Sequence, residues 1–299
     1  PPATNSPTIG AAGGVCRNIT LTSGATLIIS GSNTLTVNGD WTNNGGTLTR
    51  NTSSVIFSGT NQTIGGTSAT TFYNLEMGNS GTKTLSIYPT IAGNLTLSGS
   101  ATIKPAAALA VTGTTILSGT CRFTLGAANL LNSTPVQMNG GTFETGSSTG
   151  YAETVGTLTL TENSTLSLGT GSHALNFAAS NGTNWTAGKS LTIMNWFGTS
   201  GTSGTSGKVY FGSSTSGLTA SQLNQITFRI GSGNYQATIL STGEVVPLCA
   251  SYALTSTTAI TPCNATYSVI TLTSNPADLP VATYRVTYNL TGANTASGV

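Results

Sequence analysis

The chain carries very little charge. Only 5% of its 299 residues are Asp, Glu, Lys or Arg, whereas a typical soluble domain has about a quarter. The formal net charge is +2, and the few Lys and Arg residues form no cluster. The sequence therefore lacks the basic patch with which proteins bind nucleic acid or anionic lipid. No stretch approaches the ~20 apolar residues of a membrane-spanning helix, so we expect no direct membrane insertion.

Cysteine and histidine are also rare. Cys249 and Cys263 flank a hairpin-like segment, and a disulfide between them would suit an exported domain. Cys16 and Cys121 have no CxxC partner, and we expect both to pack as small hydrophobic residues. The only histidine, His173, lacks nearby partners for a catalytic triad or a metal site, and we expect it at the edge of a turn. The sequence predicts no metal and no cofactor.

Short apolar runs separated by Gly, Ser and Asn are abundant. They are clearest in Gly93–Gly119, where LTLSG (95–99) returns as TILSG (115–119), twenty residues later. Strands of three or four residues are too short to bury an ordinary sheet, but stacked coils of a solenoid share one continuous core. The pattern predicts a right-handed parallel β-helix with about eleven coils of ~20 residues.

Composition divides the chain into three parts. Residues 1–14 are a Pro-, Gly- and Ala-containing lead-in, and residues 15–247 carry the β-helix pattern. Residues 248–299 have longer apolar runs with Pro-containing turns, which predict a partial immunoglobulin-like β-sandwich. The fold class is all-β. The sequence starts at Pro1 without Met, and we expect it to be part of a longer protein.

Two segments depart from the β-helix pattern. Within Leu218–Phe228, Thr219 and Gln222 have the spacing of a capping box, which predicts one short helix. The run GTSGTSGTSG (198–207) predicts a mobile loop that bulges from the solenoid. The lead-in and the helix are our candidate caps for the open coil ends, which would otherwise pair with other strands.

Carboxylates are too few to make an enzyme the first choice. Lyases and hydrolases need paired carboxylates, or carboxylates that hold calcium beside a basic residue. Glu144 and Glu153 could approach each other across neighbouring coils, with Arg122 one coil below. We interpret these carboxylates as solvated surface groups and predict that the protein is not an enzyme.

Aromatic side chains provide a candidate binding surface. An aromatic ring that stacks on a sugar ring is a common way to bind neutral glycans, and Trp41 and Tyr73 are our candidates for that role. The alternative is that the aromatic residues cap the core or shield a coil end. This alternative applies also to the other members of the set, which are Trp185, Trp196, Tyr88 and Tyr151.

Two stretches resemble a known group of proteins. The segment Gly39–Met77 resembles the repetitive β-helical segments of very large surface proteins of Bacteroidota, and Gly217–Pro247 resembles the closing piece of autotransporter-like β-helices. A β-helix followed by immunoglobulin-like repeats is similar to the giant adhesins of those bacteria, including the gliding-motility adhesins. The resemblance implies type IX secretion, an extracellular location on the cell surface, and attachment. It supplies no catalytic or ligand-binding residues.

Three functions follow as hypotheses. The first is a non-enzymatic adhesin module, a rigid rod that attaches to surface glycans or abiotic surfaces and depends on secretion or anchoring machinery. The second is an architectural spacer or docking module without its own ligand. The third is a β-helix that binds or degrades polysaccharides.

Overall fold

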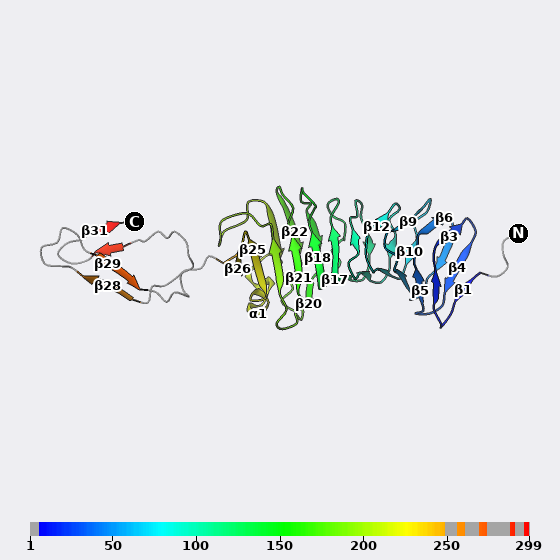
Figure 1. The fold of residues 1–299 in the computed structure, drawn as a ribbon, viewed down its shortest axis with the longest axis horizontal. Helices are drawn as coiled ribbons and strands as arrows, with labels where there is room; N and C mark the ends of the chain where they lie inside the picture. The colour runs from blue at the N-terminus through cyan, green and yellow to red at the C-terminus, as the bar shows by residue number, and fades with distance from the viewer. Residues whose placement is uncertain (1–5, 249–255, 261–268, 274–287, 291–295, 299) are drawn as a thin grey trace. The chain divides into compact units, whose positions relative to one another are not determined.

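Figure 1 shows the fold in a computed structural model, which describes residues 6–248, 256–260, 269–273, 288–290 and 296–298. The chain falls into two compact units, Pro1–Leu248 and Cys249–Val299. In the first unit, short parallel strands stack coil upon coil into a β-solenoid. The prediction of an all-β parallel β-helix is confirmed for this unit.

One long sheet runs through the whole solenoid, and its neighbouring strands pair in parallel. Its strands are β2 (Gly14–Cys16), β5 (Thr34–Val37), β8 (Ser54–Phe57), β11 (Asn74–Met77), β14 (Leu95–Leu97), β15 (Thr102–Ile103), β17 (Thr115–Thr124), β18 (Val136–Glu144), β20 (Leu158–Glu162), β21 (Ser164–Ser167), β23 (Leu191–Met194) and β25 (Ile226–Ile230).

Shorter sheets form the other faces. The first contains β1 (Thr8–Ile9), β4 (Thr26–Ile29) and β7 (Thr47–Thr49), and the second contains β3 (Ile19–Thr22), β6 (Trp41–Asn44), β9 (Gln62–Gly66) and β12 (Lys83–Leu85). The third contains β10 (Thr71–Phe72), β13 (Thr90–Ile91) and β16 (Ala110–Val111). A later face is built from β19 (Glu153–Val155), β22 (His173–Phe177) and β24 (Gly207–Phe211). Because β1 already pairs with β4, the solenoid includes part of the predicted lead-in.

The solenoid makes about eight turns, fewer than the eleven expected from a constant coil length. The early coils do keep the expected length, because Thr34 pairs with Ser54 in the next coil. Later coils are longer, since Ser164 pairs with Leu191 and Leu191 pairs with Ile226. Because the later coils contain more residues each, the same length of chain forms fewer coils.

The core is a set of ladders of identical or similar side chains. In the long sheet, Leu35, Val55, Leu75 and Leu95 lie in register in successive coils, and each is at most 2% exposed. Successive residues of a strand point to opposite faces, which places the intervening Thr side chains outside. Apolar residues at every second position therefore produce a dry interior although each strand is short.

Turn side chains connect neighbouring coils. Asn74 Oδ1 accepts a hydrogen bond from the backbone N–H of Asn94 at 3.0 Å, and Asn94 Oδ1 accepts one from Thr114 at 2.9 Å. The same contact to a residue one coil on is made by Asn18, Asp40, Asn61 and Asn163. These bonds satisfy backbone donors that lie between strands, which explains why the turns are rich in Asn.

The last coils are closed by antiparallel strands. The strand β26 (Gly233–Ile239) pairs with β25, and β27 (Glu244–Pro247) pairs with β24 and β26. Just before β25 lie the short 3-10 helix η1 (Thr215–Gly217) and the helix α1 (Ala220–Leu223). The predicted capping box at the start of α1 is confirmed, because Thr219 and Gln222 bond each other's backbone N–H. Antiparallel pairing ends the run of parallel strands.

In the second unit the described residues form two antiparallel pairs. One joins β28 (Ser256–Ile260) to β29 (Val269–Thr273), and the other joins β30 (Tyr288–Leu290) to β31 (Ala296–Gly298). The immunoglobulin-like sandwich stays a prediction. The predicted disulfide partners Cys249 and Cys263 lie outside the described residues.

Candidate functional site

The two predicted stacking residues do not form an exposed aromatic surface. Trp41 occupies an inward position of β6, where it is fully buried, and its indole N–H donates to Thr70 Oγ1 at 2.9 Å. The ring of Tyr73 is half-buried, and the guanidinium carbon of Arg50 lies 5.8 Å from its centroid. The prediction for Trp41 is therefore wrong, and a cation already occupies a face of Tyr73. The other aromatic residues of the set, Trp185, Trp196, Tyr88 and Tyr151, all pack against the core.

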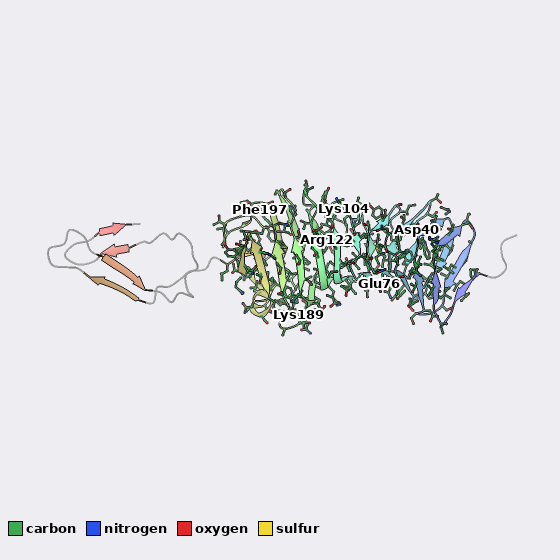
Figure 2. The ribbon with its side chains drawn as sticks, in the orientation of Figure 1. Asp40, Glu76, Lys104, Arg122, Lys189 and Phe197 are labelled. Carbon is green, nitrogen blue, oxygen red and sulfur yellow. The ribbon has the colours of Figure 1, made fainter. Side chains whose placement is uncertain are left out.

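Phe197, the more exposed of two exposed aromatic residues among the described residues of the solenoid, is one that the sequence analysis did not single out. Phe197 lies near the C-terminal end of the solenoid (Figure 2). It is 54% exposed and lines a groove of about 330 Å³. The polar side chains of this Phe197 groove are Glu144, Ser147, Ser148, Ser167, Thr170 and Asn195. Hydroxyl, amide and carboxylate groups thus surround one exposed ring.

The Phe197 groove crosses three successive coils at the ends of their strands. Glu144 ends β18 and pairs in register with Ser167, which ends β21. Ser167 in turn pairs with Met194, the residue before Asn195. Because neighbouring parallel strands lie ~4.8 Å apart, the polar groups follow one another across the wall at that spacing.

The backbone at Asn195 turns Phe197 toward solvent. Along β23 the buried residues alternate, with Leu191 and Ile193 inside, so continued alternation would bury position 195 and expose position 196. Asn195 instead has a φ of 60°, in the left-handed region that Asn tolerates better than most residues. The alternation shifts by one residue, which buries Trp196 and exposes Phe197.

A buried histidine supports the groove from inside. His173 begins β22 directly after a bend, which confirms the predicted turn-edge position, and it is only 7% exposed. Its Nε2 lies 2.8 Å from Thr145 Oγ1, and its Nδ1 lies 2.9 Å from the carbonyl oxygen of Gly171. A carbonyl oxygen only accepts, so Nδ1 carries the proton in this network. Thr145 Oγ1 also accepts from the N–H of Gly169, which lines the groove.

The carboxylate of the groove is already paired. Arg122 lies one coil below Glu144, as the sequence predicted, and the two form an ion pair; Glu144 also accepts from Thr124 Oγ1 at 2.6 Å, so it is not the solvated group we expected. Arg122 is half exposed, whereas the Glu144 side chain is mostly covered. At the other side, Lys104 Nζ donates to Ser147 Oγ at 2.9 Å. The groove is therefore bordered by a carboxylate that Arg122 pairs and, on the other side, by the ammonium group of Lys104.

The proposed partner of Glu144 lies elsewhere. Glu153 is 1% exposed in β19, and its carboxylate accepts from the backbone N–H groups of Leu130 and Leu131 at 2.6 and 3.2 Å. Burial raises the pKa of Glu153, although these N–H groups oppose the shift. Our interpretation of Glu153 as a solvated surface group is wrong. It holds a turn in place and does not face the Phe197 groove.

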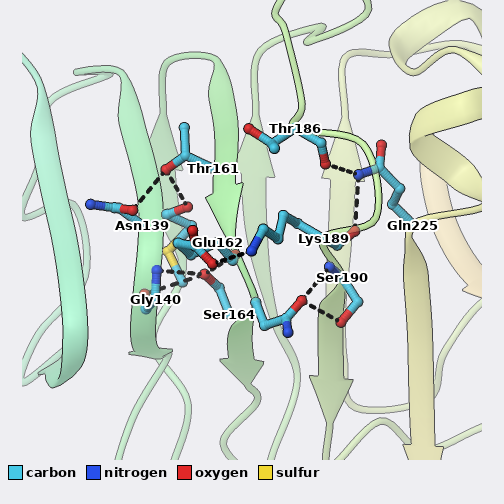
Figure 3. A network of polar contacts seen from close by, with 11 residues as sticks. Asn139, Gly140, Thr161, Glu162, Ser164, Thr186, Lys189, Ser190 and Gln225 are labelled. Atoms are coloured by element: carbon cyan, nitrogen blue, oxygen red, sulfur yellow. Dashed lines mark hydrogen bonds and ion pairs between the residues drawn. The ribbon is translucent and has the colours of Figure 1, made fainter.

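The remaining carboxylates of the solenoid also bind their own chain. Figure 3 shows Glu162, whose Oε2 accepts from Lys189 Nζ at 2.6 Å. In the same network Gln225 donates to the carbonyl oxygens of Thr186 and Lys189. Glu244 is 1% exposed and accepts from the N–H of Gly204 at 2.8 Å, so it too is not a surface group. Asp40 and Glu76 accept from the next coil.

Neither the cysteines nor the described acidic and histidine side chains form a metal site. Within the described residues, no group of three or more His, Cys, Asp or Glu side chains is placed to hold a metal ion. Cys121 is fully buried, as predicted, and burial raises the pKa of its thiol to about 11. Cys16 is half-buried against the core, and burial raises its thiol pKa as well. Both are free thiols.

A larger hollow of about 600 Å³ lies at the first coils. It is lined by residues 19–27 together with Ser6 and Pro7. These residues are aliphatic or small and polar, and none is charged or aromatic. The hollow therefore offers hydroxyl groups without a charged or aromatic side chain, whereas the Phe197 groove combines all three.

Comparison with known proteins gives no relative. No protein-family model, no curated protein and no solved structure matches the chain significantly. None of the helices among the described residues has the length and hydropathy that crossing a membrane requires.

Proposed function

We propose that this chain is a non-enzymatic adhesion module, a β-helical rod that belongs to a large bacterial surface protein and attaches it to glycans or other surfaces. The segments that resemble Bacteroidota adhesins support this proposal, as does the exposed Phe197 on a weakly charged wall. In this proposal the chain is secreted by the type IX route, and an immunoglobulin-like domain follows a right-handed β-helix.

One observation carries the non-enzymatic part of the proposal. The chain has seven Asp and Glu residues, and all except Asp278 lie in the solenoid. Each of these six accepts a hydrogen bond or an ion pair from its own chain. Hydrolysis of a glycosidic bond needs one carboxylate to protonate the leaving group and a second to act as base or nucleophile. In this wall the carboxylates serve as structural acceptors.

The low charge supports attachment to uncharged surfaces. Two ion pairs occur among the described residues, Arg122 with Glu144 and Lys189 with Glu162. Contacts made by hydroxyl, amide and aromatic groups depend little on ionic strength, because salt screens charges rather than hydrogen bonds or apolar contacts. We therefore expect attachment that changes by less than about twofold between low and high salt.

A second function is favoured by the turns. Side chains such as Asn74 and Asn94 link each coil to the next through the backbone, which makes the solenoid a stiff element regardless of any ligand. This stiffness is sufficient for an architectural spacer, which needs no ligand-binding site. The two functions differ in whether the isolated chain binds a surface.

The test uses the complete 299-residue chain coupled to beads. We expect the beads to bind immobilised glycans more strongly than beads coated with an unrelated β-protein, with little salt dependence. Incubation with neutral and acidic polysaccharides should release no reducing ends. Release of reducing ends that disappears in Glu144→Gln would overturn the non-enzymatic proposal. Beads that bind no surface would leave the spacer as the function.

A further inference from the structure

We propose that the Phe197 groove is a binding site for a single uncharged hexopyranose residue of a glycan. This inference rests on the adhesive function proposed above and assigns it to one place on the wall. It is carried by the exposed ring, by the polar groups around that ring, and by the charge pairing beneath them.

The ring of Phe197 supplies the apolar contact. It is 54% exposed, although a Phe side chain loses free energy when it faces water. Its exposure follows from the left-handed backbone at Asn195, which turns Trp196 into the core and Phe197 toward solvent. One face of a pyranose ring carries mainly C–H groups, and such a face packs against an aromatic ring.

The polar side chains supply donors and acceptors for sugar hydroxyls. Ser147, Ser148 and Thr170 are exposed; the hydroxyls of Ser147 and Ser148 can donate and accept, whereas that of Thr170 donates to the carbonyl oxygen of Ser148 at 3.0 Å and remains an acceptor. Asn195 Nδ2 donates to Ser167 Oγ at 3.2 Å, which leaves its amide oxygen as an acceptor toward the groove. A volume of about 330 Å³ lies at the lower end of the ~300–1,000 Å³ of small-molecule sites.

The charges in the groove favour an uncharged ligand. Glu144 would repel the carboxylate of a uronic acid on its side of the groove, whereas the ammonium group of Lys104, bound to Ser147, would repel an amino sugar on the other side. The carboxylate still has lone pairs that neither Arg122 nor Thr124 occupies, so it can accept from a sugar hydroxyl. A hydroxyl group of a neutral hexose can therefore donate to the Glu144 carboxylate, whose charge Arg122 balances.

The groove is held in place before any ligand arrives. Thr145, fixed by His173, bonds the N–H of Gly169 in the groove lining. Two lining residues, Glu144 and Ser167, end strands that pair in register, and Asn195 directly follows Met194, which pairs with Ser167. Binding therefore requires little ordering of side chains or loops, which limits its entropic cost.

The test measures binding of methyl glycosides to the complete chain by saturation-transfer NMR. The probes are the methyl pyranosides of glucose, galactose and mannose, with methyl glucuronide and methyl glucosaminide as charged comparisons. We expect at least one neutral glycoside to bind, with the strongest saturation on the C–H groups of one ring face. Each charged analogue of a bound sugar should bind about tenfold more weakly.

Matched variants locate the site. Phe197→Ala should weaken binding by about tenfold or more, whereas Phe197→Trp should retain it. Tyr235→Ala is the control, because Tyr235 is 42% exposed in β26 and does not line the groove. Unfolding temperatures of all variants establish that they fold. Absence of binding by every neutral glycoside, or equal binding by Phe197→Ala, would overturn the inference.

The bead assay separates this inference from the adhesive function. Adhesion that survives Phe197→Ala would overturn the assignment to the groove and leave the function standing. Glycoside binding that requires Phe197, together with beads that attach to no surface, would support the groove and overturn adhesion. If Phe197→Ala loses adhesion and glycoside binding while Tyr235→Ala keeps them, the adhesive function and the groove site are both supported.

Discussion

Thr115 pairs in register with Val136 inside the solenoid, and its hydroxyl has no hydrogen-bond partner among the described residues. The residue is fully buried, at a position that Leu95 fills in the preceding coil. A buried hydroxyl without a partner has lost its hydrogen bonds to water and gained nothing in return. Thr115 is therefore a weak point in an otherwise apolar ladder.

We expect Thr115→Val to stabilise the protein. Valine has nearly the same shape, and it removes a buried polar group whose cost is about 1 kcal/mol or more. The free energy of unfolding, measured by urea denaturation, should rise by roughly that amount. Thr96→Val is the matched control, because Thr96 lies on the outer face of the neighbouring coil, and its effect should stay within about 0.5 kcal/mol. A destabilised Thr115→Val variant would show that the hydroxyl has a partner in solution.

The buried ammonium group of Lys83 should make the stability of the protein depend on pH. Lys83 is 3% exposed, and its ammonium group donates to Gln62 Oε1 at 2.9 Å and to the carbonyl oxygens of Gly59 and Thr60. Burial lowers the pKa of Lys83 from 10.5 to about 8. Between these values the unfolded chain keeps a proton that the folded chain has released. Stability should therefore rise as pH increases from about 8 to about 10.5.

The rise should amount to a few kcal/mol at most, since one pKa unit corresponds to about 1.4 kcal/mol. Urea denaturation over this pH range measures it, and Lys83→Met should remove it because the variant has no titrating group at this position. Lys104→Met is the control, since Lys104 is exposed and should keep the wild-type slope. Parallel curves for the wild type and Lys83→Met would mean that Lys83 titrates alike in both states.

The features that sequence predicted correctly are local or repeat at a fixed interval. Alternating apolar residues identified the β-solenoid, and the spacing of Thr219 and Gln222 identified a helix of only four residues. The position of Arg122 one coil below Glu144 followed from the coil length, although the ion pair between them was not predicted. Each of these depends on a few neighbouring residues or on one repeated distance.

The candidate site could not be predicted in the same way. Phe197 is exposed because a single φ angle at Asn195 shifts the alternation of β23, and no pattern of residue types reveals that angle. Glu153 and Glu244 are buried because backbone N–H groups more than twenty residues away bind them. The turn count was wrong because late coils lengthen. Such features depend on where distant segments meet.

Substitution of Trp41 should mainly lower the stability of the protein, whereas substitution of Phe197 should mainly weaken glycoside binding. Trp41 contacts Phe57 and Phe72 edge-on in the core, with ring centroids 6.5 and 5.1 Å away. Trp41→Ala should lower the free energy of unfolding by about 3–5 kcal/mol, whereas Phe197→Ala should change it by less than about 1 kcal/mol. Urea denaturation measures both. Equal losses of stability would contradict the placement of Phe197 on the surface.

The final prediction concerns the loop 198–207, whose composition predicts mobility. In the structure Glu244 contacts this loop, because it accepts from the N–H of Gly204 at 2.8 Å and from Ser203 Oγ at 2.6 Å. The carbonyl oxygen of Phe197 accepts from the N–H of Thr205 at 2.8 Å, so the same loop supports the groove.

Glu244→Ala should release the loop. We expect amide hydrogen exchange at Gly204 and Thr205 to accelerate by about tenfold or more, because loss of a buried acceptor costs about 1–3 kcal/mol. Glu244→Gln keeps an oxygen that can accept from Gly204 and should have a smaller effect. Glu162→Ala removes an exposed carboxylate and should leave this loop unchanged. Rapid exchange already in the wild type would mean that Glu244 does not hold the loop. Slow exchange that Glu244→Ala removes, together with weaker glycoside binding, would connect the buried carboxylate to the position of Phe197.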